Sequence, residues 1–431
     1  MVTPSPIEKT AHYPLLRFIL LGYCLLLLAL AFLWDDPAHI WAGLKAIVFS
    51  SGTLLTDYMA LAGIGAAFVN SAVVLLIFLA VLTLARVPMN GSVLLTFGLM
   101  AGFSLFGKNI FNLWPILFGG WLSAKIRKVP FRSCATVVLM ASTLGPLVSF
   151  LCLSGTPFSL PLGLGVGILI GLVVPALTGH TAKMQGGLNL YNVGFACGLT
   201  ALVLTPLLHA MGYSPAATAG VWATGLNGPM GLFLGGLSLA CILAGLFCAG
   251  PSPREALGNY LTLLKATGRS PCDFLRDFGG AAVLLNTGVN GLLGTGYILA
   301  IGGDLNGPTV GAILTIMGFS AAGKHARNLL PIMAGVLLGG LVMQWNPTDP
   351  GAQIAALFGT TLAPVAGVFG WPAGVLTGFL HGSVVLRTGG FVGGVNLYNN
   401  GFSGGLIATL LFPILSAFFP DKEKKEPAEM P

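Results

Sequence analysis

Apolar runs of about 20 residues recur along the whole chain and are separated by short polar stretches. A run of this length spans the hydrocarbon core of a bilayer as an α-helix. The pattern therefore predicts an all-α integral membrane protein with about seven hydrophobic segments in each half. The predicted segments are 14–34, 57–86, 90–107, 109–124, 133–153, 159–180 and 187–210, then 228–249, 278–301, 306–322, 327–344, 351–369, 371–388 and 394–417. Short interfacial helices are expected around 40–52 and 254–270.

The two halves of the chain are copies of one unit. Residues 102–116 match 318–332 with nine of 15 positions identical, and 186–199 match 393–406 with ten of 14 identical. Repeats of this kind indicate a duplicated architecture. Weaker matches upstream pair three residues of the first half with three of the second: Asp57 with Asp277, Asn70 with Asn290, and Lys45 with Lys265. We predict a first membrane repeat at 10–212, a second at 226–420 and a cytoplasmic tail at 421–431.

Basic residues predict that the repeats have opposite orientations. The loop 125–132 carries four Lys or Arg residues, whereas its counterpart 345–350 carries none. Because positive loops stay in the cytoplasm, the first loop is expected inside and the second outside. An odd number of segments per repeat produces this inversion and places both chain termini in the cytoplasm, where Lys422, Lys424 and Lys425 would lie.

The segments on either side of Lys108 and Lys324 are short and rich in glycine. Each pair either crosses the membrane fully or forms a re-entrant hairpin with the lysine at its tip. The second arrangement gives five spans plus a hairpin per repeat. Non-helical backbone at membrane depth is tolerated only where it is buried in protein or lines a cavity, so two such tips would meet near the midplane.

Composition excludes a soluble protein, since 55% of the 431 residues are hydrophobic and only 8% are charged. The 62 glycines and 27 prolines are typical of membrane helices that pack closely or break. The net charge of +7 comes from loops and tail, so it indicates orientation and no nucleic-acid partner. The seven cysteines lack metal-ligand spacing, and we predict no metal site and no cofactor.

Lys108 and Lys324 are the sharpest candidate site residues. A charge inside a membrane segment marks function by default, and no acidic residue lies near either lysine in the sequence. Contact with the solute is the preferred interpretation; bonding to backbone carbonyls and snorkelling to the interface remain alternatives. The same repeated block supplies further candidate solute ligands: Ser104, Asn112, Ser320 and Asn328.

A second repeated block has the sequence Asn-Leu-Tyr-Asn-x-Gly-Phe. Its amides and phenols could bind a polar solute or a cation such as Na⁺, although bonds between helices would also explain it. The candidate residues here are Asn189, Tyr191, Asn192, Asn396, Tyr398 and Asn399.

At these two blocks the chain resembles a bacterial membrane family of unknown function whose domain occurs twice. It is more faintly similar to urea transporters, which have an inverted duplication and a Gly-Tyr-Asn-Gly block in each half. In that comparison Tyr191-Asn192 and Tyr398-Asn399 match, with Asn70 and Asn290 near an early helix. This chain has extra segments, lacks the glycine directly after each asparagine, and carries the mid-membrane lysines. Its layout is also similar to that of anion carriers with paired re-entrant hairpins.

We expect a secondary transporter for a small polar, anionic solute in the cell membrane, with the lipid bilayer as its surroundings. A passive channel for a small neutral solute, urea-like in size, is the first alternative. A membrane-embedded enzyme is the second, but the sequence lacks the nucleophile–base pair or metal cluster that such an enzyme needs. Na⁺ is kept as a candidate coupling ion, and association into a homo-oligomer is left open.

Overall fold

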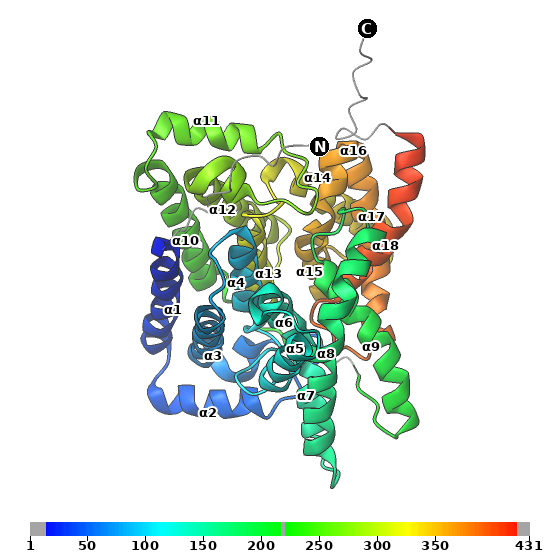
Figure 1. Cartoon of the computed structure of the whole chain (residues 1–431). Helices are drawn as coiled ribbons and strands as arrows, with labels where there is room; N and C mark the ends of the chain where they lie inside the picture. The colour runs from blue at the N-terminus through cyan, green and yellow to red at the C-terminus, as the bar shows by residue number, and fades with distance from the viewer. Residues whose placement is uncertain (1–13, 217–219, 420–431) are drawn as a thin grey trace.

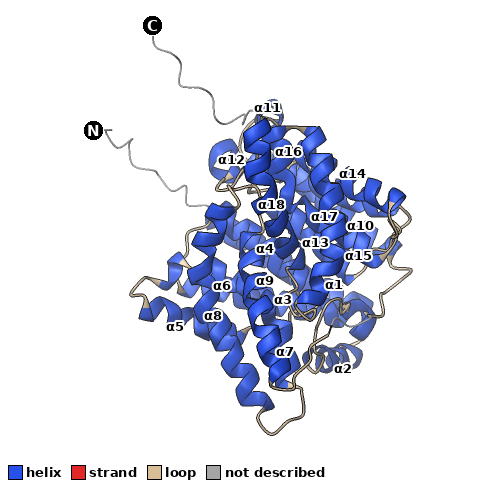
Figure 2. Ribbon diagram, turned by 90° about the vertical axis from the view of Figure 1, so that its right-hand side faces the viewer, coloured by secondary structure: helices blue, strands red, loops and turns tan. Residues whose placement is uncertain are grey.

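The computed structural model describes residues 14–216 and 220–419, and these ranges contain helices and no β-strand (Figure 2). The predicted tail at 421–431 and the first residues of the chain lie outside the described residues. The first half comprises α1 (Pro14–Trp34), α2 (Pro37–Val48), α3 (Tyr58–Leu84), α4 (Gly91–Phe103), α5 (Trp114–Ile126), α6 (Ala135–Ala141), α7 (Gly145–Cys152), α8 (Ser159–Met184) and α9 (Asn192–Ala210). The second half comprises α10 (Asn227–Phe247), α11 (Pro253–Leu263), α12 (Phe274–Ala300), α13 (Gly307–Phe319), α14 (Ala326–Val342), α15 (Pro350–Gly359), α16 (Ala363–Phe369), α17 (Trp371–Phe391) and α18 (Asn399–Phe418).

Among the described residues, nine helical segments are long and apolar enough to cross a membrane, with α6–α7 and α15–α16 each counted as one. The protein is a multi-pass membrane protein. Many large apolar side chains point outward, such as Leu33 at 80% and Leu232 at 79% exposure, whereas many polar side chains are fully buried. This distribution suits helices surrounded by lipid, because lipid solvates apolar side chains and leaves polar ones to pair internally.

Helices α4, α5 and α13 have 13 residues each. At 1.5 Å per residue such a helix is about 20 Å long, shorter than the roughly 30 Å hydrocarbon core. These three helices are therefore shorter than an ordinary membrane-spanning helix, whereas α14, with 17 residues, is at the lower end of the spanning range.

Every predicted segment corresponds to a helix or a pair of helices, and the second half repeats the helix order of the first. Figure 1 shows α2 and α11, which occupy the same place in the two halves, at opposite ends of the molecule. Helices α4 and α13 pack antiparallel, since Gly98 lies against Gly318 while Gly102, further along α4, lies against Gly311.

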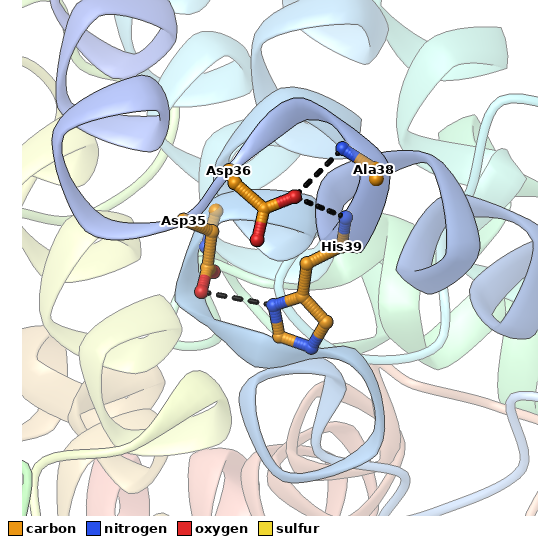
Figure 3. Close-up of polar contacts among 5 residues, drawn as sticks. Asp35, Asp36, Ala38 and His39 are labelled. Atoms are coloured by element: carbon orange, nitrogen blue, oxygen red, sulfur yellow. Dashed lines mark hydrogen bonds and ion pairs between the residues drawn. The ribbon is translucent and has the colours of Figure 1, made fainter.

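The corner between α1 and α2 is built around two adjacent carboxylates (Figure 3). Asp36 is the N-cap of α2 and accepts hydrogen bonds from the backbone N–H groups of Ala38 and His39 at 2.9 and 3.0 Å. These bonds, that of His39 first, hold the pKa of Asp36 below its ordinary value. Asp35 contacts His39 Nδ1 at 3.0 Å and also accepts a bond from Gly65 N–H at 2.6 Å.

The Gly65 bond is needed because α3 is interrupted one turn after it begins. Gly63 has φ 86°, and the equivalent Gly279 of α12 has φ 82°, so both helices are broken at the same place. A left-handed residue releases backbone N–H groups of the next turn. In α3 the carboxylate of Asp35 takes one of them.

Candidate functional site

The chain between α4 and α5 and the chain between α13 and α14 are non-helical loops that carry the two lysines. Ser104 and Ser320 are the C-caps of α4 and α13. Each hydroxyl donates back to a carbonyl of its own helix, to Met100 O at 2.8 Å and to Ile316 O at 3.0 Å. These serines are fully buried and are engaged in closing the helix ends.

Asn112 and Asn328 close the other side of the same two loops. Asn112 donates to Gly107 O at 3.0 Å, and Asn328 donates to Gly323 O at 2.8 Å. Each side-chain oxygen accepts a backbone N–H three residues earlier. The two amides therefore hold the loops in one conformation, and their role in solute binding stays a prediction.

Two asparagines on long helices tie each loop to the bundle. Asn70 of α3 donates to Ser104 O and Lys108 O at 2.7 and 3.0 Å. In the second half the same two bonds, to Ser320 O and Lys324 O, are made by Asn286 at 2.9 and 2.7 Å.

The sequence-based pairing of Asn70 with Asn290 and of Asp57 with Asp277 was therefore wrong. The N-cap of α3 is Asp57, and the N-cap of α12 is Asp273. In both pairs the second residue lies four positions, about one helical turn, beyond the true equivalent. The pairing of Lys45 with Lys265 is displaced by the same four positions. Asn286 and Asn290 lie on one helix face, and Asn290 bonds the Ser320 hydroxyl instead.

The amine of Lys108 is fully buried among neutral groups. Its Nζ lies 2.8 Å from Ser142 Oγ, 2.9 Å from Met100 Sδ and 3.4 Å from Leu139 O. Ser142 begins the 3₁₀ turn that separates α6 from α7. Within the described residues, no carboxylate forms an ion pair with Lys108.

The amine of Lys324 is equally buried but has different neighbours. It donates to Tyr191 Oη and, at 2.7 Å, to Thr360 Oγ1, and it lies 4.3 Å from the centroid of the Tyr191 ring. Thr360 is the counterpart of Ser142 and begins the 3₁₀ turn between α15 and α16. Over the described part of the chain this lysine also has no carboxylate partner.

Each Asn-Leu-Tyr loop is inserted into the other half of the protein. Leu190 N–H donates to Thr361 O at 3.0 Å, and Leu397 N–H donates to Thr143 O at 3.2 Å. Asn189 reaches Gly401 O at 3.1 Å, and its equivalent Asn396 reaches Gly194 O at 3.4 Å. The repeated block thus joins the two halves near the lysines.

The second asparagine of each block lies at the start of α9 or α18. Asn192 donates to Thr178 O at 2.8 Å, and Asn399 donates to Val385 O at 3.2 Å. The side-chain oxygen of each is buried and has no hydrogen-bond partner in the described structure.

The two tyrosines of the blocks stack at the centre of the molecule, with ring centroids 4.7 Å apart. Phe103, Phe319 and Phe358 pack around them. The tyrosine hydroxyls differ, since Tyr191 Oη bonds Lys324 whereas Tyr398 Oη is buried with no partner among the described residues.

Ser142 and Thr360, which face the lysine amines, were not among the predicted site residues. A signal for them exists in the sequence, because Ser-Thr-Leu-Gly-Pro at 142–146 matches Thr-Thr-Leu-Ala-Pro at 360–364. In each, a proline follows hydroxyl residues in the middle of an apolar segment. This combination indicates a broken helix with exposed backbone groups.

Most of the chain matches one protein family, described as protein of unknown function (DUF1576), at residues 36–210 and 252–417. The protein belongs to this family, and the two-part match agrees with the duplication. No curated protein matches the chain. A search of solved structures also gave no match.

Proposed function

We propose that the protein is a secondary transporter for a small anionic solute, built from two inverted repeats with one re-entrant hairpin each. The opposite ends occupied by α2 and α11 and the antiparallel packing of α4 against α13 support the inversion. Helices α4 and α5 are too short to cross singly, which supports a hairpin. Transporters of this kind bind their solute near the midplane, where interrupted helices meet.

The observation that carries the proposal is the pair of fully buried lysines at the two loops. A protonated amine inside a membrane protein is costly unless it is paired. Lys108 and Lys324 have only hydroxyl, thioether, carbonyl and ring partners. An anionic solute would supply the charge that the protein does not.

The unlike surroundings of the two lysines support alternation between two states. By the repeat relation, the bond between Lys324 and Tyr191 has a counterpart between Lys108 and Tyr398. Here both lysines bond the hydroxyl of the nearby 3₁₀ turn, but only Lys324 also bonds a tyrosine; Lys108 lies against Met100 Sδ instead, and Tyr398 Oη has no partner in the described structure. In our proposal the other state exchanges these contacts and opens the solute site to the other side.

The centre of the molecule favours a carrier over a passive channel. The rings of Tyr191, Tyr398, Phe103 and Phe358 are all exposed by 1% or less. A stack of packed rings leaves a solute no continuous path, whereas a carrier in a closed state needs such a barrier.

The proposal predicts that small anions raise the thermal stability of the full chain in neutral detergent. A ligand at a hundredfold excess over its Kd adds about 2.7 kcal/mol to the folded state. The panel contains chloride, nitrate, acetate and succinate, with urea and acetamide as neutral solutes and choline replacing Na⁺ in a parallel series. The stabilisation should disappear in Lys108→Gln and Lys324→Gln and persist in Lys125→Gln, an exposed lysine.

Each variant is first measured without ligand, so that a folding defect is separated from lost binding. Stabilisation by urea or acetamide that survives both lysine substitutions would overturn the carrier proposal in favour of the channel. Loss of the anion effect when choline replaces Na⁺ would identify Na⁺ as the coupling ion.

A further inference from the structure

A pocket of about 350 Å³ lies between the loop after α11, the start of α14 and the junction of α16 with α17. Figure 1 places α11, α14 and α16 at one end of the molecule. Its lining includes Lys265, Thr267, His325, Arg327 and Trp371, and none of its lining residues is acidic. The pocket is therefore lined by two basic side chains, Lys265 and Arg327, and by no carboxylate.

Helix geometry adds to this charge. The first residues of α14 and α17 both line the pocket, so two helix N-termini open onto it. Each N-terminus carries about half a positive charge and unpaired backbone N–H groups. Such ends bind oxyanions when they converge with basic side chains.

His325 supplies a buried polar atom that points to a ligand. The side chain is only 1% exposed, and its Nε2 donates to Ala266 O at 2.9 Å. Its Nδ1 is buried at the N-cap of α14, on the side of the Asn328 N–H in a capping box, and makes no hydrogen bond of ordinary geometry in the described ranges. Since a carbonyl only accepts, the proton lies on Nε2, and Nδ1 of the neutral ring is an acceptor. A ligand that carries an O–H group would satisfy it.

The first half has the same loop without the charges. Lys265, His325 and Arg327 correspond to Phe49, Asn109 and Phe111. Asn109 donates to Ile47 O at 3.2 Å, near the end of α2, so the side chain at this position bonds a nearby backbone carbonyl in both halves, although the carbonyls are not equivalent. The fold therefore does not need a basic residue or an imidazole at these positions, and the charges have another use.

We propose that this pocket binds a small oxyanion that retains an O–H group, of which hydrogen phosphate is the simplest example. Arg327 and Lys265 bind the anionic oxygens, and His325 Nδ1 accepts the O–H. Free phosphate and a phosphate monoester headgroup of a lipid share this chemistry. The binding site itself does not depend on the proposed transport.

The position of the pocket gives it a role that does rest on the proposed function. Gly323 and Gly268 meet backbone to backbone between the pocket and Lys324, with no room for a side chain on either glycine. An anion bound in the pocket would be separated from Lys324 by this contact. It would reach Lys324 when the segments that carry Gly268 and Gly323 move apart. The pocket thus serves as a vestibule on one face only.

The test titrates inorganic phosphate against the thermal stability of the full chain in neutral detergent at constant ionic strength. The effect must saturate, because exclusion of phosphate from protein surfaces stabilises without saturating. We expect Arg327→Gln and Lys265→Gln each to weaken the apparent affinity about tenfold, the loss expected for one charge-assisted hydrogen bond. Both residues are exposed, so the variants fold, and the matched control is Arg127→Gln. Sulfate, which lacks the proton at neutral pH, should bind more weakly than phosphate, and His325→Asn should remove that preference.

A lipid arm repeats the titration with phosphatidic acid in mixed micelles. Stabilisation by phosphatidic acid alone, lost in the Arg327 and Lys265 variants, assigns the site to a headgroup; stabilisation by free phosphate assigns it to a soluble anion. No saturable effect of either, or one unchanged in both variants, overturns the site. Lys324→Gln separates the proposals: loss of the phosphate effect in Lys324→Gln with retention in the pocket variants overturns the pocket, and the transport site is judged on the other anions alone.

Discussion

At the scale of single residues, the unlike hydroxyls of Tyr191 and Tyr398 are the most informative feature. They occupy equivalent positions, pack against each other with tilted rings and are both buried, yet among the described residues only Tyr191 has a hydrogen-bond partner. A hydrogen bond contributes about 0.5–1.5 kcal/mol net, whereas a buried hydroxyl without a partner costs free energy. Tyr191 therefore stabilises this conformation, whereas the unpaired hydroxyl of Tyr398 destabilises it.

This difference predicts opposite effects of one substitution. Tyr191→Phe should lower the free energy of unfolding by about 0.5–1.5 kcal/mol, because Lys324 loses its hydroxyl partner. Tyr398→Phe should leave it unchanged or raise it, because no bond is lost. Thermal denaturation in one detergent checks the pair, and equal destabilisation by both would contradict the asymmetry.

The loops that carry the lysines depend on two asparagines that make matched bonds, Asn70 in one half and Asn286 in the other. Asn290 bonds a side-chain hydroxyl and Lys324 O more distantly, at 3.3 Å. The amide at position 286 therefore organises the loop directly, and the amide at 290 adds to it.

At the scale of elements, glycine determines how closely α4 and α13 pack. A Cβ on Gly98 would lie 2.7 Å from Gly318 Cα and 2.7 Å from Leu314 O. Small residues allow such backbone contacts between membrane helices. The contact crosses from one repeat to the other, so it positions the two lysine loops relative to each other.

Gly98→Ala should therefore destabilise the protein by about 1–3 kcal/mol, the usual cost of overpacking. The matched control is Gly235→Ala on α10, where an added Cβ meets nothing within 4 Å. The control should stay within about 1 kcal/mol of the parent chain. The measurement is thermal denaturation of both variants, and a neutral Gly98→Ala would show that the helices separate freely.

At the scale of the whole molecule, the two repeats are joined by loops that each insert into the other half, as well as by the packing of helices. Each Asn-Leu-Tyr loop bonds the broken helix of the other half, through Leu190 to Thr361 and Leu397 to Thr143. Movement of one half must therefore alter the surroundings of the lysine in the other. This coupling is what alternation between two states requires.

The proposed inversion of the repeats predicts which loops an impermeant reagent reaches from each side of the membrane. In a chain with its seven cysteines replaced, Arg132→Cys should react with an impermeant thiol reagent only from the cytoplasmic side. Thr348→Cys, at the corresponding loop of the second repeat, should react only from outside. Both native residues are exposed. Labelling of intact cells and of inverted vesicles makes the comparison, and reaction of both from one side would mean parallel repeats.

The sequence by itself determined the membrane location, the duplication and the approximate place of the apolar helices, because apolar runs and repeated blocks are local properties of the chain; it did not give the breaks inside 133–153 and 351–369. It also located the lysine loops, since Gly-rich short segments around a charge are unusual in a membrane. It misaligned Asp57 and Asn70 by one helical turn, because residues four apart share a helix face and an apolar pattern cannot separate them.

Only the tertiary structure shows which side chains are in contact. Ser142 and Thr360 face the lysines, Lys324 bonds a tyrosine of the other half, and the positive pocket joins loops from three parts of the chain. These contacts depend on how the two repeats are packed, and the equivalent lysines have different partners. Part of that asymmetry follows the sequence, because Met100 beside Lys108 is replaced by Ile316 in the second half, and the rest is a property of the assembled fold.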